Sequence, residues 1–140
     1  MIQEDKELLL KDLCVRLPYG VKVEYRNEVF DIEHVSPMYE EVKLDTYETW
    51  TVYVSDVKPY LFPLSSITEE QRNDISKLLI ETQNEFSPYG ELNMKGCDNL
   101  FICTVKQANV FINYCLTYHL DINGLIEKGL AIDATGLNIY

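Results

Sequence analysis

The spacing of apolar residues changes at Pro18-Tyr19-Gly20, and this change limits the folds that the chain can adopt. Before it, apolar residues recur at spacings of three and four, which predicts a helix from about Gln3 to Arg16; they are Leu9, Leu10, Leu13, Cys14 and Leu17. Proline cannot continue a helix, and glycine allows the turn that follows. Beyond the turn, apolar and polar residues alternate, which is the period of a strand. A helix followed by strands predicts an α+β fold.

The alternation continues over four segments and a fifth apolar segment follows, which predicts an antiparallel β-meander of about four to five strands. The first four segments are residues 21–25, 30–34, 42–44 and 50–54, with a tight turn near Asn27-Glu28. The segment 57–64 is predicted to be an edge strand, because Pro59 and Pro63 cannot donate hydrogen bonds to a neighbouring strand.

Helical patterns return in the second half. Thr68 to Gln71 and Thr104 to Gln107 have the form of capping boxes, in which two side chains satisfy free backbone amides at a helix start. Gly124 to Gly129 is typical of one helical turn closed by a left-handed glycine, and residues 130–139 predict a short strand pair. The polar segment from Ser87 to Asn99 is predicted to be a loop. We therefore expect one α+β domain over residues 1–140: an N-terminal helix, the meander, two longer helices and a short C-terminal helical turn.

Charge, apolar runs and cysteine content argue against nucleic-acid binding and membrane binding. The net charge is −11, whereas direct nucleic-acid binding needs clustered lysine and arginine. The apolar runs are too short to cross a membrane, and the first residues do not resemble a signal peptide. The four cysteines are expected to be reduced thiols in a chain of this length. These features predict a cytoplasmic protein without nucleic-acid or membrane binding.

Much of the negative charge lies in residues 28–56, which hold eight acidic residues and one base, Lys43. If the apolar positions of the strands face the core, the alternating positions face outward. This predicts a sheet face that carries Asp31, Glu33, Glu41, Asp45, Thr51 and Tyr53. One interpretation is a solvated face that discourages edge pairing. The other is a docking surface for a basic partner protein, with mimicry of nucleic-acid charge or calcium binding as variants.

The last third suggests a different chemistry. Cys97, Cys103, Cys115 and His119 are three thiols and an imidazole, a ligand set that zinc accepts, although the first spacing is longer than in a zinc knuckle. Cys115, His119 and Asp121 also supply the residue types of a cysteine nucleophile site. Core cysteines are the alternative for both. No phosphate loop, dinucleotide motif, serine elbow or HExxH motif occurs, so no catalytic residue is assigned.

Three blocks of the chain carry a family resemblance: Leu8 to Val23, Val57 to Gln71, and Gly124 to Asp133. Together they resemble a family of short uncharacterised proteins encoded by gut anaerobic bacteria and their phages and mobile elements. That family has no established function, so the resemblance implies a cytoplasmic accessory gene product and transfers no catalytic residue.

Three hypotheses follow from the sequence. The first is a non-enzymatic protein-binding or regulatory domain that needs no cofactor and uses the acidic sheet face. The second is a small metal-binding or hydrolytic enzyme built on the Cys/His/Asp group. The third is a structural or assembly component of a phage or mobile element, for example a homo-oligomer joined through the segment 57–64.

Overall fold

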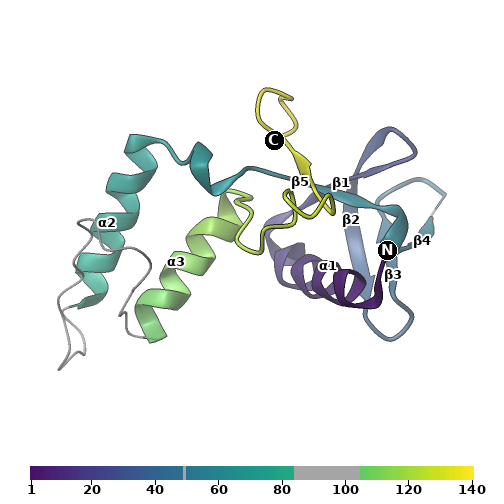
Figure 1. Cartoon of the computed structure of the whole chain (residues 1–140), viewed down its shortest axis with the longest axis horizontal. Helices are drawn as coiled ribbons and strands as arrows, with labels where there is room; N and C mark the ends of the chain where they lie inside the picture. The colour runs from purple at the N-terminus through teal and green to yellow at the C-terminus, as the bar shows by residue number, and fades with distance from the viewer. Residues whose placement is uncertain (49, 84–104) are drawn as a thin grey trace. The chain divides into compact units, whose positions relative to one another are not determined.

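The computed structural model describes residues 1–48, 50–83 and 105–140 of the chain (Figure 1). Their contacts form two compact units. The first unit combines Met1–Ser66 with Leu116–Tyr140, and the second is Ile67–Cys115. The predicted loop from Ser87 to Asn99 lies outside the described residues. The single domain expected over residues 1–140 stays a prediction.

The first unit begins as the sequence predicts. Helix α1 spans Gln3–Arg16 and is followed by a 3₁₀ turn, Leu17–Tyr19, with Gly20 in the left-handed region at φ +74°. Four strands then form a meander of antiparallel neighbours: β1 Lys22–Tyr25, β2 Glu28–Ser36, β3 Glu41–Leu44 and β4 Thr51–Tyr53.

The turn between β1 and β2 has positive φ at both central residues, Arg26 (+53°) and Asn27 (+65°). This is the backbone of a type I′ turn, whose twist matches that of a two-stranded hairpin. The turn therefore lies one residue earlier than the sequence predicts.

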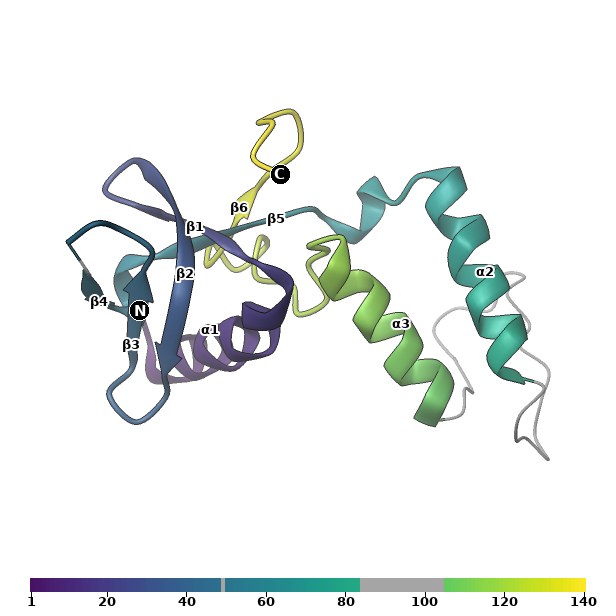
Figure 2. The same ribbon diagram turned by 180° about the vertical axis from the view of Figure 1, so that it is seen from behind.

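Helix α1 covers one face of this sheet (Figures 1 and 2). Leu9 and Leu13 on the helix are fully buried in one cluster with strand residues that include Val23, Val42 and Leu44. Burying each such side chain contributes roughly 1.5–3 kcal/mol, which explains why the helix and the alternating strands fold together.

The segment 57–64 differs from the prediction of an edge strand. Strand β5, Lys58–Leu61, lies inside the sheet, whose order within the described residues is β4-β3-β2-β1-β5-β6. Pro59 is directly opposite Val23 of β1, so the proline is accommodated inside the ladder. The prediction assumed that a strand containing proline, which has no backbone N–H, must lie at an edge. Strand β5 is only four residues long, and the proline removes at most one hydrogen bond from it.

The C-terminal part adds β6, Ile132–Asp133, which pairs with β5 in parallel. The expected strand pair over residues 130–139 is therefore a single short strand, and the sheet is mixed. The predicted helical turn is present before it. The amide of Leu130 donates to the Leu125 carbonyl at 2.9 Å and that of Gly129 to the Ile126 carbonyl at 3.0 Å, with Gly129 at φ +71°. This is the Schellman arrangement in which glycine ends a helix.

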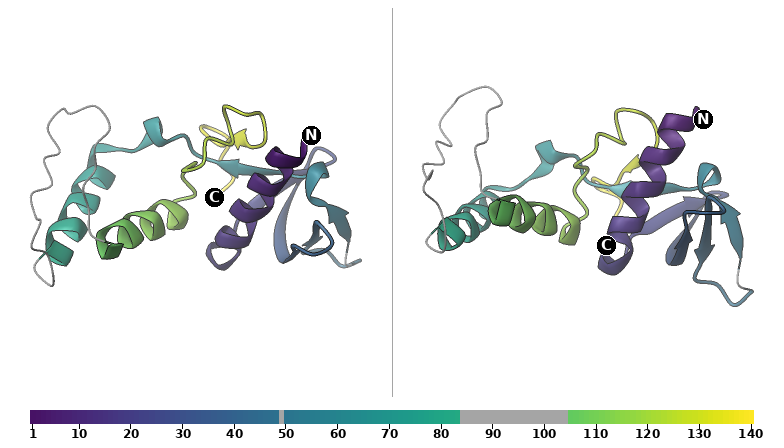
Figure 3. Two further views of the ribbon diagram at one scale, coloured as in Figure 1. Left: turned by 60° about the horizontal axis from the view of Figure 1, so that its bottom comes forward. Right: turned by 90° about the horizontal axis from the view of Figure 1, so that it is seen from below.

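The second unit contains α2, Glu69–Gln83, and most of α3, Val105–Thr117, which lie side by side (Figure 3). The capping box predicted for α2 is present: the Gln71 amide donates to Thr68 Oγ1 at 3.2 Å, and the Thr68 amide donates to Gln71 Oε1 at 3.0 Å. Ile75 and Leu79 pack against Phe111 and Tyr114. Thr104, the first residue of the second predicted box, lies outside the described residues.

Among the described residues, no helix has both the length and the hydropathy needed to cross a lipid bilayer.

Candidate functional site

The alternation of the meander strands orients the predicted site residues as expected. Val42 and Leu44 of β3 and Val52 of β4 are buried, whereas Thr51 and Tyr53 are exposed and Glu41 is partly exposed. On β2 and just after β3, Asp31, Glu33 and Asp45 are exposed too. All six residues thus remain accessible in the first unit, five of them on the paired strands β2, β3 and β4 and Asp45 directly after β3.

The β2 part of this face is not uniformly negative. The Lys22 Nζ of β1 donates to both carboxylate oxygens of Asp31 at 2.8 Å, and Lys43 Nζ of β3 lies 2.8 Å from Glu33 Oε2. At the turn between β2 and β3, Lys6 of α1 holds Glu40 at 2.6 Å and, with Gln3, lowers the pKa of that carboxyl. Exposed pairs of this kind add little stability, but they cancel charge locally. A single negative patch over the whole face does not follow from these placements.

The charge is uncompensated further along the sheet. We use the term acidic edge for four carboxylates near β4 that have no ion-pair partner within the described residues: Glu41, Asp45, Glu48 and Asp56. The chain contains no lysine or arginine between residues 44 and 57. The acidic edge is therefore the part of the candidate face that can attract a cation or a basic side chain.

Aromatic side chains accompany the acidic edge. Tyr53 has an exposed fraction of 60%, and Tyr47 is fully exposed in the connection between β3 and β4. Trp50 contacts Tyr25 and Phe30, with ring centroids 6.4 and 6.1 Å from its own, and its Nε1 donates to Glu48 at 3.3 Å. Aromatic rings next to carboxylates supply contact area to a protein partner.

Strand β4 pairs only with β3 within the part of the chain that the structure describes. The Leu44 amide donates to the Trp50 carbonyl and the Val54 amide to the Glu40 carbonyl, and Val42 lies opposite Val52. In an antiparallel ladder, the amides and carbonyls of the intervening residues point away from the neighbouring strand. Those of Thr51 and Tyr53 therefore point outward, at the end of the sheet where β4 is the last strand (Figure 2).

The Cys/His/Asp group is only partly described. Cys97 and Cys103 lie outside the described residues. Cys115 is buried in the second unit, whereas His119 and Asp121 belong to the first unit. Within the described residues, no group of three or more cysteine, histidine or acidic side chains is arranged to hold a metal ion.

Asp121 has a local structural role. Its two carboxylate oxygens accept the amides of Leu125 and Ile126, both at 2.9 Å, and so cap the helical turn that ends at Gly129. An acceptor engaged in this way fixes the turn and is poorly placed to orient a nucleophile.

His119 is partly buried against Tyr140, with ring centroids 3.7 Å apart and an angle of 10° between the rings. Burial, together with the positive charges of Arg16 and Lys22, lowers the pKa of His119 to about 4. The imidazole is therefore neutral at pH 7. Tyr140 is held by its hydroxyl, which donates to the Tyr60 carbonyl at 2.8 Å and accepts the Lys22 amide at 3.1 Å. Burial raises the pKa of Tyr140 to about 12.

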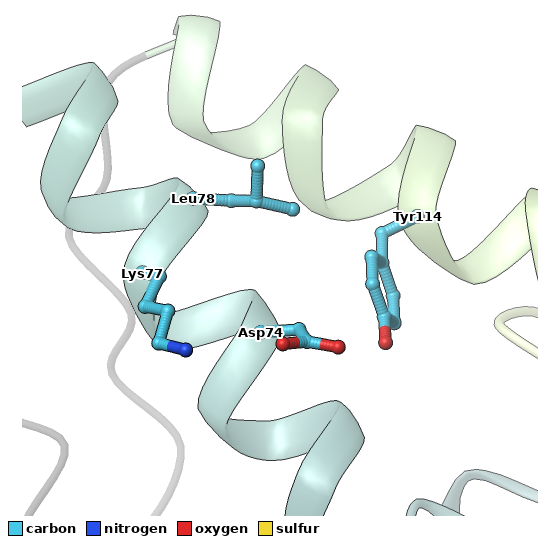
Figure 4. A pocket seen from close by; sticks show the side chains of 4 residues that line it. All are labelled: Asp74, Lys77, Leu78 and Tyr114. Atoms are coloured by element: carbon cyan, nitrogen blue, oxygen red, sulfur yellow. The ribbon is translucent and has the colours of Figure 1, made fainter.

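The second unit contains a shallow pocket of about 320 Å³ between α2 and α3, lined by Asp74, Lys77, Leu78 and Tyr114 (Figure 4). Asp74 and Lys77 come from the same helix and oppose each other in charge, and Leu78 is itself 37% exposed. The lining contains no pair of groups with an evident acid–base or nucleophilic role.

No protein-family model matches the chain, and no curated protein or solved structure matches it significantly.

Sequence reasoning left two residues of the acidic edge out of the candidate set. Glu48 and Asp56 lie in the connections on either side of β4, where strand alternation does not predict orientation. The signal that identifies them is the absence of lysine and arginine between residues 44 and 57. Unpaired charge, rather than strand position, distinguishes these carboxylates from Asp31 and Glu33.

Proposed function

We propose that the protein is a non-enzymatic binding or regulatory domain that recognises a basic surface of a partner protein through the β3–β4 side of its sheet. The supporting observation is that the acidic edge, Glu41, Asp45, Glu48 and Asp56, has no compensating cation among the described residues. Charges that are already satisfied within the protein contribute little to recognition, whereas unpaired charges steer an oppositely charged partner and select against wrong ones.

Thr51 and Tyr53 complete this proposed surface. Both side chains are exposed, and the tyrosine supplies apolar area with a hydroxyl that can donate or accept. In this proposal Asp31 and Glu33 have a secondary role, because their lysine partners must be displaced before they can contact another protein.

The proposal includes a cytoplasmic accessory role in a bacterium or one of its phages or mobile elements. Among the described residues, Cys14 forms no disulfide, which is compatible with a reducing compartment. No observation among the described residues favours the hydrolytic or metal-binding alternative enough to make it a second proposal.

Affinity capture from the native host tests this function, followed by reconstitution with the purified partner. The test variant carries Glu41→Gln, Asp45→Asn, Glu48→Gln and Asp56→Asn, which remove charge while keeping similar volume. The matched control carries Asp31→Asn and Glu33→Gln, where the charges are already paired. We expect the partner's affinity to fall at least tenfold in the test variant and by less than threefold in the control.

Raising the salt concentration from about 50 to about 300 mM should weaken the wild-type complex and affect the test variant much less, because screening acts on exposed charges. Equal affinity of wild type and test variant for the reconstituted partner would show that the acidic edge is only a solvated surface.

A further inference from the structure

We propose that β4 is a docking edge at which an extended basic segment of the partner adds as a further antiparallel strand. This inference rests on the proposed function and specifies its geometry. It starts from β4, Thr51–Tyr53, as the terminal strand of the sheet, with the amides and carbonyls of Thr51 and Tyr53 directed away from β3. Extended peptides bind such edges through main-chain hydrogen bonds, and alternate side chains provide specificity.

An open strand edge usually carries features that prevent pairing, such as lysine, proline or a bulge. Strand β4 contains none of these three in the sequence Thr51-Val52-Tyr53, and the register shift of this sheet lies between Ile32 and His34 of β2, away from β4. The protective feature is negative charge, because the carboxylates of the acidic edge lie on β3 and in the connections before and after β4. Negative charge repels a second copy of a chain with a net charge of −11. It attracts a segment that carries lysine or arginine, so a basic heterologous segment is the favoured occupant.

The two faces of β4 specify the pattern of that segment. Val52 has an exposed fraction of 9% and belongs to the core, so an added residue beside it continues the apolar face. Thr51 and Tyr53 lie on the opposite face, where Tyr53 is directly opposite Glu41 and Thr51 is directly opposite Lys43, whose charge is paired with Glu33. Added residues beside Thr51 and Tyr53 therefore lie on the same face as Glu41. The expected occupant alternates apolar and basic residues.

A capped peptide in which lysine and valine alternate tests this geometry, with binding to the whole chain measured by calorimetry. In the proposed register the lysine amides point toward β4 and the valine amides point away. N-methylation of the lysine amides should weaken binding at least tenfold, because each lost hydrogen bond accounts for a factor of about two to ten. N-methylation of the valine amides is the matched control and should change affinity by less than threefold.

Substitution of the protein gives an independent test. Thr51→Pro removes an outward amide without removing a hydrogen bond to β3, so the strand tolerates it and peptide affinity should fall at least threefold. Thr51→Val keeps the amide and should bind like wild type. If Thr51→Pro does not fold, the N-methylated peptides still decide the question.

The outcomes separate this inference from the proposed function. If both methylated peptides bind as tightly as the parent, strand addition is wrong. Loss of that binding in Glu41→Gln/Asp45→Asn would then leave electrostatic docking intact. If the parent peptide does not bind at millimolar concentration, and the edge charges prove irrelevant to the captured partner, both proposals fail. A wild-type dimer in sedimentation that Thr51→Pro dissociates would assign the edge to a second copy and overturn the inference.

Discussion

The buried ion pair between Asp12 and Arg16 of α1 is expected to contribute strongly to the stability of the first unit. Arg16 is fully buried and Asp12 is 2% exposed. Arg16 Nε donates to Asp12 Oδ2 at 2.6 Å and its Nη2 to Asp12 Oδ1 at 3.2 Å, and the same Nη2 also donates to the Leu120 carbonyl at 2.8 Å. Asn123 Nδ2 donates to Asp12 Oδ1 at 2.8 Å. Through Leu120 and Asn123, these hydrogen bonds connect the segment after α3 to α1.

Replacing Arg16 by methionine leaves the Asp12 carboxylate buried with Asn123 as its remaining side-chain donor. Removing one partner of a buried pair costs about 3–5 kcal/mol, because an uncompensated charge stays inside. The Leu120 carbonyl loses a donor as well, which accounts for about 1 kcal/mol of the same loss. We therefore expect Arg16→Met to lower the free energy of unfolding of the first unit by about 4 kcal/mol, a large share of the 5–15 kcal/mol typical of a domain.

The double variant Asp12→Leu/Arg16→Met provides the control. It removes both charges and should lose no more than about 1–2 kcal/mol, since apolar residues of similar volume replace buried pairs at little cost. Urea unfolding followed by the fluorescence of Trp50, the single tryptophan, reports on the first unit alone. If Arg16→Met loses less than about 1 kcal/mol, or the double variant loses as much as the single one, water reaches the pair and the reasoning fails.

Two further predictions concern the second unit and the pH dependence of the first. Thr68→Ala should lower the stability of α2 by about 1 kcal/mol, while Thr68→Ser keeps the cap, as measured by amide exchange along the helix. The pKa of His119 is lowered to about 4, so its folded environment favours the neutral ring; the stability that this provides is present above pH 6.5 and is lost as the pH falls toward 4. His119→Asn, which tolerates the positive φ of 56°, should therefore show a smaller decrease of the urea midpoint between pH 7 and pH 4.5 than wild type. Equal slopes would refute this role.

The local elements of the fold were predictable because their signals are local. The helix Gln3–Arg16 and the capping box at Thr68 follow from spacing and from side chains three residues apart. The position of β5 was not predictable in the same way. Its neighbours β1 and β6 are distant in sequence, and Pro59 gave a misleading local signal.

In the candidate site, too, local features were predictable from the sequence and contacts between strands were not. Five of the six carboxylate, threonine and tyrosine positions are exposed and Glu41 is partly exposed, whereas their role as a binding face stays a prediction. Alternation did not predict which charges are paired. The ion-pair partner of Asp31 is Lys22, which lies outside residues 28–56 and is brought close only by the pairing of β1 with β2. Glu33 is paired with Lys43, the single lysine or arginine in residues 28–56. Counting charges along the chain therefore overestimates the negative charge on β2, whereas the absence of lysine and arginine between residues 44 and 57 indicates that the charge near β4 stays unpaired.

The uneven distribution of lysines explains how the terminal strand β4 can avoid pairing with a second copy of the chain and still bind a basic segment. A short terminal strand with two outward-facing residues offers few hydrogen bonds, so side chains decide which strand can approach it. Lys22 and Lys43 neutralise carboxylates on β2, and the absence of lysine and arginine from residues 44–57 leaves the carboxylates next to the terminal strand without an ion-pair partner among the described residues. Placing a lysine beside the open backbone, for example Tyr53→Lys, should therefore weaken binding of a basic segment and also reduce the repulsion between two copies. The same carboxylates would then account for both properties, since the charge that excludes a second copy is the charge that selects a basic strand.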